Sequence, residues 1–304
     1  MAYNNLEKLK LIAVTGPTGA GKSTFINHVC GSRLKVGTGL RSCTTQIDVA
    51  WRVMGDNKVV LIDTPGFDDT RRSQADVLKD IGDFLKKTYE EGVKLAGVIY
   101  VHRISDRRVG GIARENFRLF RSICGTDAMR NVFIVTTMWE DVAEGVGAAR
   151  EHELTTKPIF FQPAVEEGAQ MLRHWNNAES AESIVRSLIE HSARTLQMQR
   201  ELVDEGRPMP DTSAGRDLSA FLQEQEKRHQ EELQKLKEDL KSARDREIKE
   251  LKGELEKKKK ELQKVRKEEE KLQPRDGIRY YLKAGYRVEV RVLLCWKVYR
   301  IMEQ

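Results

Sequence analysis

A glycine-rich stretch near the amino terminus has the residue types and spacing that bind a phosphate chain. Residues 16–24 read GPTGAGKST, which matches the pattern GxxxxGK[ST], and they follow the apolar run Leu11–Thr15. Glycines permit positive φ angles and let backbone N–H groups close around a diphosphate, helped by the N-terminus of the helix that follows. Lys22 should bridge the β- and γ-phosphates, and the Ser23 hydroxyl should ligate Mg²⁺. The predicted phosphate-binding residues are Gly16, Pro17, Thr18, Gly19, Ala20, Gly21, Lys22, Ser23 and Thr24.

A second loop has the sequence expected of a phosphate sensor. Residues 63–66 read DTPG and come directly after the apolar run Val59–Ile62. We expect Asp63 to hold Mg²⁺ through water, and the Gly66 amide to contact the γ-phosphate. Residues 67–72 would then form a switch that orders with the triphosphate and relaxes after hydrolysis.

The segment between these two loops supplies a third expected ligand. Residues 35–46 are rich in Gly, Ser and Thr and poor in apolar side chains. P-loop switches place a hydroxyl on Mg²⁺ in this segment, so Thr44 or Thr45 is the predicted ligand, with Thr44 favoured. The alternative is a plain connecting loop, since Ser and Thr are common in loops.

With these three elements in order, the chain resembles TRAFAC-class GTPases, and specifically the septin-like group with the avirulence-induced and chloroplast-import GTPases. GPTGAGKST, SCTT, DTPGF and the later HRISDRR carry the resemblance, which covers about residues 8–205. It implies a doubly wound P-loop domain that uses GTP or GDP with Mg²⁺. It also implies a GTP-hydrolysing switch that forms a homodimer or oligomer across its nucleotide face.

The base-reading loop departs from the pattern [NT]KxD of this family. After the apolar run Val132–Thr136 the sequence continues TMWED, with Thr137 at the start and no lysine to lie over the base. Glu140 or Asp141 should accept hydrogen bonds from the guanine N1–H and N2 groups, and adenine offers no matching pair of donors, so GTP is favoured over ATP. Alternatively, both acids simply start the next helix. We expect the loop that closes the base pocket near Gln162–Ala164.

The residue after DTPG bears on the rate of hydrolysis. Ras-like enzymes orient the attacking water with a glutamine at this position, but the chain has Phe67, so slow intrinsic turnover is expected. Arg103 lies where the fourth predicted strand ends, and the resemblance implies that this region reaches a neighbouring site. Arg103 is therefore the predicted arginine finger of a homodimer, with His102 as second candidate. The alternative is a surface ion pair between Arg103 and Asp106.

Apolar and amphipathic segments alternate in the rhythm of a doubly wound α/β sheet. The predicted strands are Leu11–Thr15, Ile47–Met54, Val59–Ile62, Leu95–His102, Val132–Thr136 and Ile159–Phe161. The predicted helices are Lys22–Cys30, Ser73–Tyr89, Ala113–Cys124, Gly145–Leu154 and Ser180–Glu205. This order predicts a P-loop domain over residues 1–206.

A charged helical tail is expected after this domain. Residues 207–216 contain Gly and Pro and are predicted to be a linker, while residues 217–273 are rich in Glu, Lys, Arg, Gln and Leu and contain no proline. The composition predicts one helix of roughly 80 Å. Residues 274–304 have no assigned structure.

The apolar residues of the tail follow two registers. Leu233 to Ala243 keep one heptad spacing, and Ile248 to Leu272 keep another that is offset from it, so the seam must shift phase between them. Several seam positions are charged. A solitary helix with i,i+4 ion pairs and a two-stranded coiled coil with an unknown partner both remain open.

Composition limits the range of partners. The 304 residues include 33% charged side chains with a net charge of +6, which indicates a mixed surface and not a field that binds nucleic acid. The basic run Lys257–Lys260 permits peripheral contact with anionic lipid, although such runs are more often solvated faces. No signal peptide or transmembrane helix is expected, so we expect a cytosolic protein. The competing functions are a P-loop ATPase or small-molecule kinase, and a static GTP-bound scaffold whose coiled coil does the work.

Overall fold

A six-stranded sheet forms the centre of the molecule. The computed structural model describes residues 8–31, 48–67, 72–242 and 245–272. The strand order is β2-β3-β1-β4-β5-β6, and every neighbouring pair is parallel except the antiparallel pair of β2 and β3. The strands are β1 (Leu9–Thr15), β2 (Asp48–Met54), β3 (Asn57–Asp63), β4 (Leu95–Arg103), β5 (Val132–Thr137) and β6 (Gln170–Arg173).

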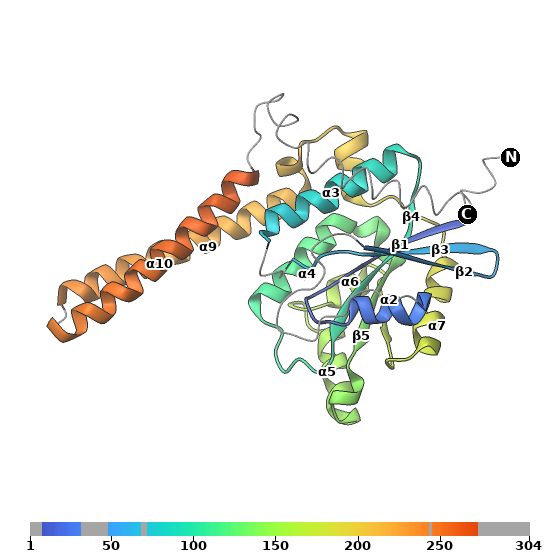
Figure 1. The fold of residues 1–304 in the computed structure, drawn as a ribbon, viewed down its shortest axis with the longest axis horizontal. Helices are drawn as coiled ribbons and strands as arrows, with labels where there is room; N and C mark the ends of the chain where they lie inside the picture. Colours follow the sequence, from blue (N-terminus) through green and yellow to red (C-terminus); the bar gives the residue numbers. More distant parts are fainter. Residues whose placement is uncertain (1–7, 32–47, 68–71, 243–244, 273–304) are drawn as a thin grey trace.

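Helices cover both faces of this sheet (Figure 1). The helices α2 (Lys22–Cys30) and α7 (Ala178–Ile189) bury apolar side chains against one face, together with inward residues of β1, β3 and β4. On the other face lie α3 (Gln74–Glu90), α4 (Gly111–Cys124) and α5 (Glu144–Thr156). The predicted doubly wound P-loop fold is therefore confirmed.

The central strand β4 is buried along almost its whole length, as expected of a parallel strand covered on both faces. Gly97 allows the close approach of α7 to this strand. A Cβ atom at Gly97 would lie 2.6 Å from a methyl carbon of Leu188 and 2.7 Å from the backbone oxygen of Asn131. Because these strands run parallel, their carboxyl ends meet at one edge of the sheet, where the predicted loops lie.

The sixth predicted strand is in the wrong place. Residues Ile159–Phe161 form a turn that leads into the short helix α6 (Gln162–Glu166), and Ile159 is 58% exposed. The edge strand β6 has the sequence QMLR, and none of its residues is fully buried. An edge strand of this kind has no apolar alternation, so its sequence gave no strand signal.

The long helix predicted over Ser180–Glu205 is also wrong in part. Helix α7 ends at Ile189, and the chain continues without regular structure to the single turn α8 (Gln197–Gln199) and the π-helical turn η3 (Arg200–Asp204). Glu201 in this turn is 3% exposed and accepts hydrogen bonds from the backbone N–H and the hydroxyl of Ser213. The turn thereby caps the first residue of the tail.

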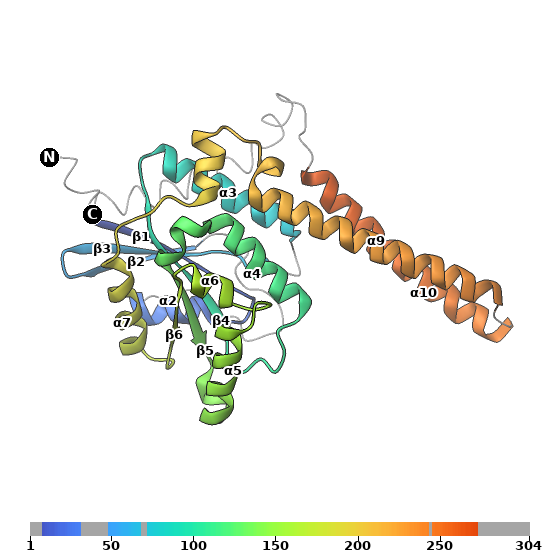
Figure 2. The ribbon, with the colours of Figure 1, turned by 180° about the vertical axis from the view of Figure 1, so that it is seen from behind.

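The tail consists of two antiparallel helices that lie side by side (Figures 1 and 2). The short turn η4 (Met209–Asp211) leads into α9 (Ser213–Ser242), and α10 (Asp245–Leu272) returns along it. Ion pairs join Glu226 to Arg266 at 2.7 Å and Glu232 to Lys258 at 2.5 Å. The predicted charged helical tail is present, but the expectation of one continuous helix of roughly 80 Å is wrong because the chain reverses. The offset of the two apolar registers marks this reversal.

The base of the hairpin packs on the P-loop domain. Leu218 and Leu222 of α9 are each 1% exposed and belong to the same core as the inner faces of α3 and α4. At the end of α10, the Lys271 ammonium donates to Asp76 at 2.8 Å and to the Ser73 hydroxyl at 3.2 Å. No helix in the described part of the chain is both long and apolar enough to cross a bilayer.

Candidate nucleotide-binding site

The loop between β1 and α2 has a backbone that only glycine can form at its first position. Gly16 has φ of 137°, and a Cβ atom there would lie 2.2 Å from the backbone oxygen of Val101. Gly19 and Gly21 also have positive φ, at 75° and 91°. Gly21 is the N-cap of α2 and makes no side-chain capping bond, so the first-turn amides of this helix are available to an anion.

Lys22 lies at the centre of this loop. Its ammonium group donates hydrogen bonds of 2.9 Å to the backbone oxygens of both Gly16 and Pro17, and the residue is 7% exposed. The lysine therefore holds one positive charge against the backbone of the glycine-rich loop. This is the arrangement predicted for a phosphate-binding loop.

The next side chain meets the second predicted loop. The Ser23 hydroxyl donates to a carboxylate oxygen of Asp63 at 2.5 Å, and Asp63 is 1% exposed at the end of β3. The Thr64 backbone N–H and hydroxyl donate to the Val14 oxygen at 3.1 and 3.0 Å, which ties the second loop to β1. A hydroxyl and a carboxylate oxygen side by side are hard ligands suited to Mg²⁺, so the donor set fits this ion.

The switch residues are only partly described. Gly66 is buried directly after the Asp63 loop, and Phe67 is 7% exposed. Thr44 and Thr45, the predicted hydroxyl ligands, lie outside the described residues. Their assignment stays a prediction.

Thr137 connects the base-reading loop to the phosphate-binding loop. It is the last residue of β5. Its hydroxyl donates to the backbone oxygen of Ala20 at 2.9 Å and lies 3.3 Å from the backbone oxygen of His102. The residue is 5% exposed. Through this buried hydrogen bond, Thr137 fixes the end of β5 against the phosphate-binding loop.

Of the two predicted base-reading acids, Glu140 has a partner in a neighbouring loop. Glu140 and Asp141 lie in an exposed 3₁₀ turn, and the Asn176 side-chain amide donates to Glu140 at 2.9 Å. Met138 and Asn176 have φ of 59° and 54°, and they are the non-glycine residues with positive φ among those described. Such strained residues cluster at functional sites.

A loop other than the expected one contacts the base-reading turn, and the closing loop expected near Gln162–Ala164 stays a prediction. Gln162–Ala164 belong to α6, whereas residues 174–177 after β6 contact the base-reading loop through Asn176. A signal for this loop exists in the sequence. The pair Asn176-Asn177 suits a left-handed turn followed by an N-cap, and the Asn177 side chain accepts from the Ser180 N–H at 2.8 Å.

Arg103 lies at the rim of the phosphate-binding loop. One of its terminal nitrogens is 3.3 Å from the position that a Cβ atom at Gly19 would take, and its side chain pairs with Asp106 at 3.1 Å. The alternative ion pair is thus present within one chain. His102 is 3% exposed with its ring against Phe161, and burial lowers the pKa of His102 to about 4. A neutral, buried imidazole is no longer a candidate for a finger that reaches another molecule.

Comparisons with known proteins agree on the nucleotide domain. The family described as 50S ribosome-binding GTPase matches residues 11–132. This match spans both predicted phosphate loops and agrees with the P-loop fold of the described residues. No curated protein matches the sequence.

Several solved structures are similar to the chain. Toc33 from Arabidopsis thaliana, in complex with Mg²⁺ and GMPPNP, is 16% identical with a TM-score of 0.47, over 62% of this chain and 88% of that one. The G domain of the T. maritima FeoB iron transporter is 16% identical with a TM-score of 0.38, over 60% and 98%. Aquifex aeolicus Era bound to GDP and AlF₄⁻ is 13% identical with a TM-score of 0.41, over 60% and 57%.

Proposed function

We propose that this P-loop GTPase domain binds GTP with Mg²⁺, hydrolyses it slowly and acts as a switch. The observation that carries the proposal is the meeting of Ser23 and Asp63 at 2.5 Å beside the buried Lys22 ammonium. A hydroxyl, a carboxylate and a lysine in this order serve the β- and γ-phosphates and their metal ion in P-loop NTPases. A glycine-rich turn with no ligand has no need of such an arrangement.

Each group of the loop has a defined task in this proposal. Lys22 exchanges its two backbone acceptors for phosphate oxygens, and the first-turn amides of α2 hold the diphosphate. Ser23 and Asp63, with Thr44 as proposed further ligand, would hold Mg²⁺, and the ion when bound would neutralise negative charge on the phosphates. The Gly66 amide senses the γ-phosphate, so the residues after it respond to the state of the nucleotide.

Guanine specificity is assigned to Glu140. Its carboxylate accepts from the N1–H and N2 groups of guanine, while adenine would present an acceptor to an acceptor. Asn176 holds one oxygen of this carboxylate at 2.9 Å and thereby restricts its orientation. Within the part of the chain that the structure describes, no other loop bonds to Asp141 in this way, so Glu140 is the favoured reader.

Slow hydrolysis follows from Phe67, which has no hydrogen-bonding group to orient water. We propose that dimerisation across the nucleotide face supplies the missing group as Arg103 of a second copy. The position of Arg103 at the Gly19 rim supports this, and its pair with Asp106 is partly exposed, so breaking that pair costs little. The rate per site should then rise with protein concentration.

The tail needs no external partner to bury its seam, because α9 and α10 pack against each other within one chain. Two lysines of the run Lys257–Lys260 already form ion pairs: Lys258 with Glu232, and Lys259 with Glu256 at 2.7 Å. We propose a cytosolic protein.

Titration with fluorescent GTP, GDP and ATP tests the binding part of this proposal. Wild type should bind the guanine nucleotides and bind ATP at least about tenfold more weakly. Lys22→Ala should abolish binding with an unchanged circular-dichroism spectrum. Ser23→Asn should weaken GTP binding in Mg²⁺ more than GDP binding, because only the triphosphate adds a γ-oxygen ligand. Unchanged affinity in Lys22→Ala would overturn the proposal.

A further inference from the structure

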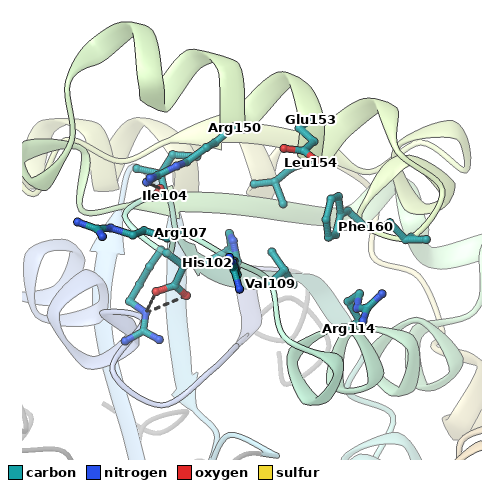
Figure 3. Close-up of a pocket in the computed structure, with 13 residues that line it drawn as sticks. His102, Ile104, Arg107, Val109, Arg114, Arg150, Glu153, Leu154 and Phe160 are labelled. Atoms are coloured by element: carbon teal, nitrogen blue, oxygen red, sulfur yellow. Dashed lines mark hydrogen bonds and ion pairs between the residues drawn. The ribbon is translucent and has the colours of Figure 1, made fainter.

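A long groove lies beside the nucleotide site, and apart from the finger candidate Arg103 and its partner Asp106 at one edge, its lining residues have no role in the steps above. It consists of two adjoining cavities of about 310 and 690 Å³, which share Arg114, Ile159 and Phe160 as lining residues. The groove runs from the end of β4, over the first turn of α4, to α9 at the base of the hairpin. Figure 3 shows the first cavity, with Arg107 and Arg114 at its two ends and Phe160 between α5 and α4.

Arginines dominate the polar lining of this groove. Several of them are already neutralised or held: Arg103 by Asp106, Arg118 by Glu115, Arg121 by Glu167, Arg228 by Glu224, and Arg150 by the backbone oxygens of Ile104 and Ser105. Arg107, Arg108 and Arg114 are exposed and form no ion pair within the described part of the chain. Three exposed positive charges therefore lie along the first cavity, against one exposed carboxylate, Glu153, that lines it without an ion pair in the described residues.

The same groove exposes apolar side chains. Ile112 is 57% exposed and Ile159 is 58% exposed, and both line the larger cavity with Phe160 and Phe221. Ile112 lies in the first turn of α4, and Ile159 lies in the turn before α6. Large apolar side chains gathered in a hollow and rimmed by charge are typical of a surface that binds another protein.

We propose that this groove, the arginine groove, docks an acidic amphipathic segment of a partner protein. Carboxylates of the segment would pair with Arg107, Arg108 and Arg114, and its apolar face would cover Ile112 and Ile159. The chain's own residues 274–304 are a poor occupant, because they contain seven Lys and Arg against three Asp and Glu. A single small anion would leave both the apolar side chains and most of the groove uncovered.

Fluorescence anisotropy with designed peptides tests this proposal on the full chain. The probe is a labelled helical peptide with Glu on one face and Leu at i, i+3, i+4 and i+7. A version with Lys for Glu, a version with Ser for Leu, and a single-stranded oligonucleotide serve as comparison ligands. The acidic amphipathic peptide should bind about tenfold or more tightly than each of these. Its binding should weaken as the salt concentration rises, because salt screens the attraction between the carboxylates and the arginines.

Matched charge reversals locate the site. Arg107→Glu, Arg108→Glu and Arg114→Glu combined should weaken peptide binding about tenfold or more. The same number of reversals at Lys86, Lys94 and Arg194, which lie outside the groove, should leave it unchanged. Ile159→Ser, which removes the apolar side chain without adding charge, should weaken binding without altering the salt dependence, while Lys22→Ala should have no effect on the peptide.

Three results would overturn the proposal. The first is equal binding of the peptide to the groove variant and to the control variant, both checked for native circular dichroism. The second is binding of the oligonucleotide or the Ser-substituted acidic peptide as tightly as the amphipathic peptide, which would reassign the groove to polyanions in general. Failure of the wild type to bind the acidic peptide would likewise exclude the proposed partner chemistry.

Discussion

Thr137→Val should weaken nucleotide binding while leaving the fold intact. The substitution keeps the shape of the side chain but removes the hydroxyl that donates to the Ala20 oxygen at 2.9 Å. Both residues are buried, so the Ala20 carbonyl loses a partner that water does not easily replace. Leaving a buried acceptor unsatisfied costs about 1–3 kcal/mol.

That free energy sets the expected loss of affinity. If the bond aligns the phosphate-binding loop for the nucleotide, its full loss lowers affinity by roughly 5- to 150-fold. A value near tenfold is expected, because part of the cost appears in the unfolding free energy of the free protein. The assay is equilibrium titration with fluorescent GDP, paired with urea unfolding of the free protein.

A matched hydroxyl far from the site separates binding from stability. Thr88 is 3% exposed, and its hydroxyl donates to backbone oxygens of Phe84 and Leu85 within α3. Thr88→Val should alter the unfolding free energy but leave GDP affinity unchanged. The reasoning is refuted if Thr137→Val binds GDP like wild type, or if Thr88→Val weakens binding to the same extent.

Two further predictions concern stability. Burial holds the pKa of His102 at about 4, below the ordinary 6.5, so stability is complete above pH 6.5 and falls as the pH drops toward 4. Urea unfolding at pH 7 and pH 5 should show a loss about 2 kcal/mol larger in wild type than in His102→Gln, and equal losses would contradict this. Leu222→Ala should lower the unfolding free energy by about 2–5 kcal/mol, because its side chain is 1% exposed between the hairpin and the domain. The same change at half-buried Leu236 should cost less, and a reversed order would show that the hairpin does not pack there.

The sequence predicted the phosphate-binding elements well because their residue types are required by local backbone geometry. Gly16 is an example, since a side chain there would collide with Val101. The pattern of apolar residues also placed five of the six strands correctly. The apolar runs of these strands are either buried on both faces of the sheet or paired with a strand that is. The pattern failed at β6, where a polar edge strand contributes few buried side chains.

The tail shows how tertiary contacts decide between local alternatives. Composition predicts helix throughout, and both arms are helical. The two helices could form one continuous helix or fold back on each other. The outcome depends on which apolar face packs against another, and composition does not determine this. The phase shift between the registers is the sequence signal of the reversal, and the pair of Glu226 and Arg266 joins the two arms across the hairpin.

The loop that contacts Glu140 was missed for a related reason. Asn176 reaches Glu140 across 36 residues of sequence, from the loop that follows a strand the apolar pattern did not reveal. Motif spacing identifies a site where the motif is contiguous, as in residues 16–24. It does not identify a residue that arrives from another strand end.

Single-turnover hydrolysis of GTP and ATP, measured side by side over a range of protein concentrations, tests the central claim most directly. We predict slow cleavage of GTP, little or no cleavage of ATP, and a rate per active site that rises with concentration in wild type. In Arg103→Ala the rate should stay low and independent of concentration. Equal cleavage of ATP and GTP would contradict a guanine-specific switch, and an absence of GTP cleavage at every concentration would leave a nucleotide-bound scaffold in its place.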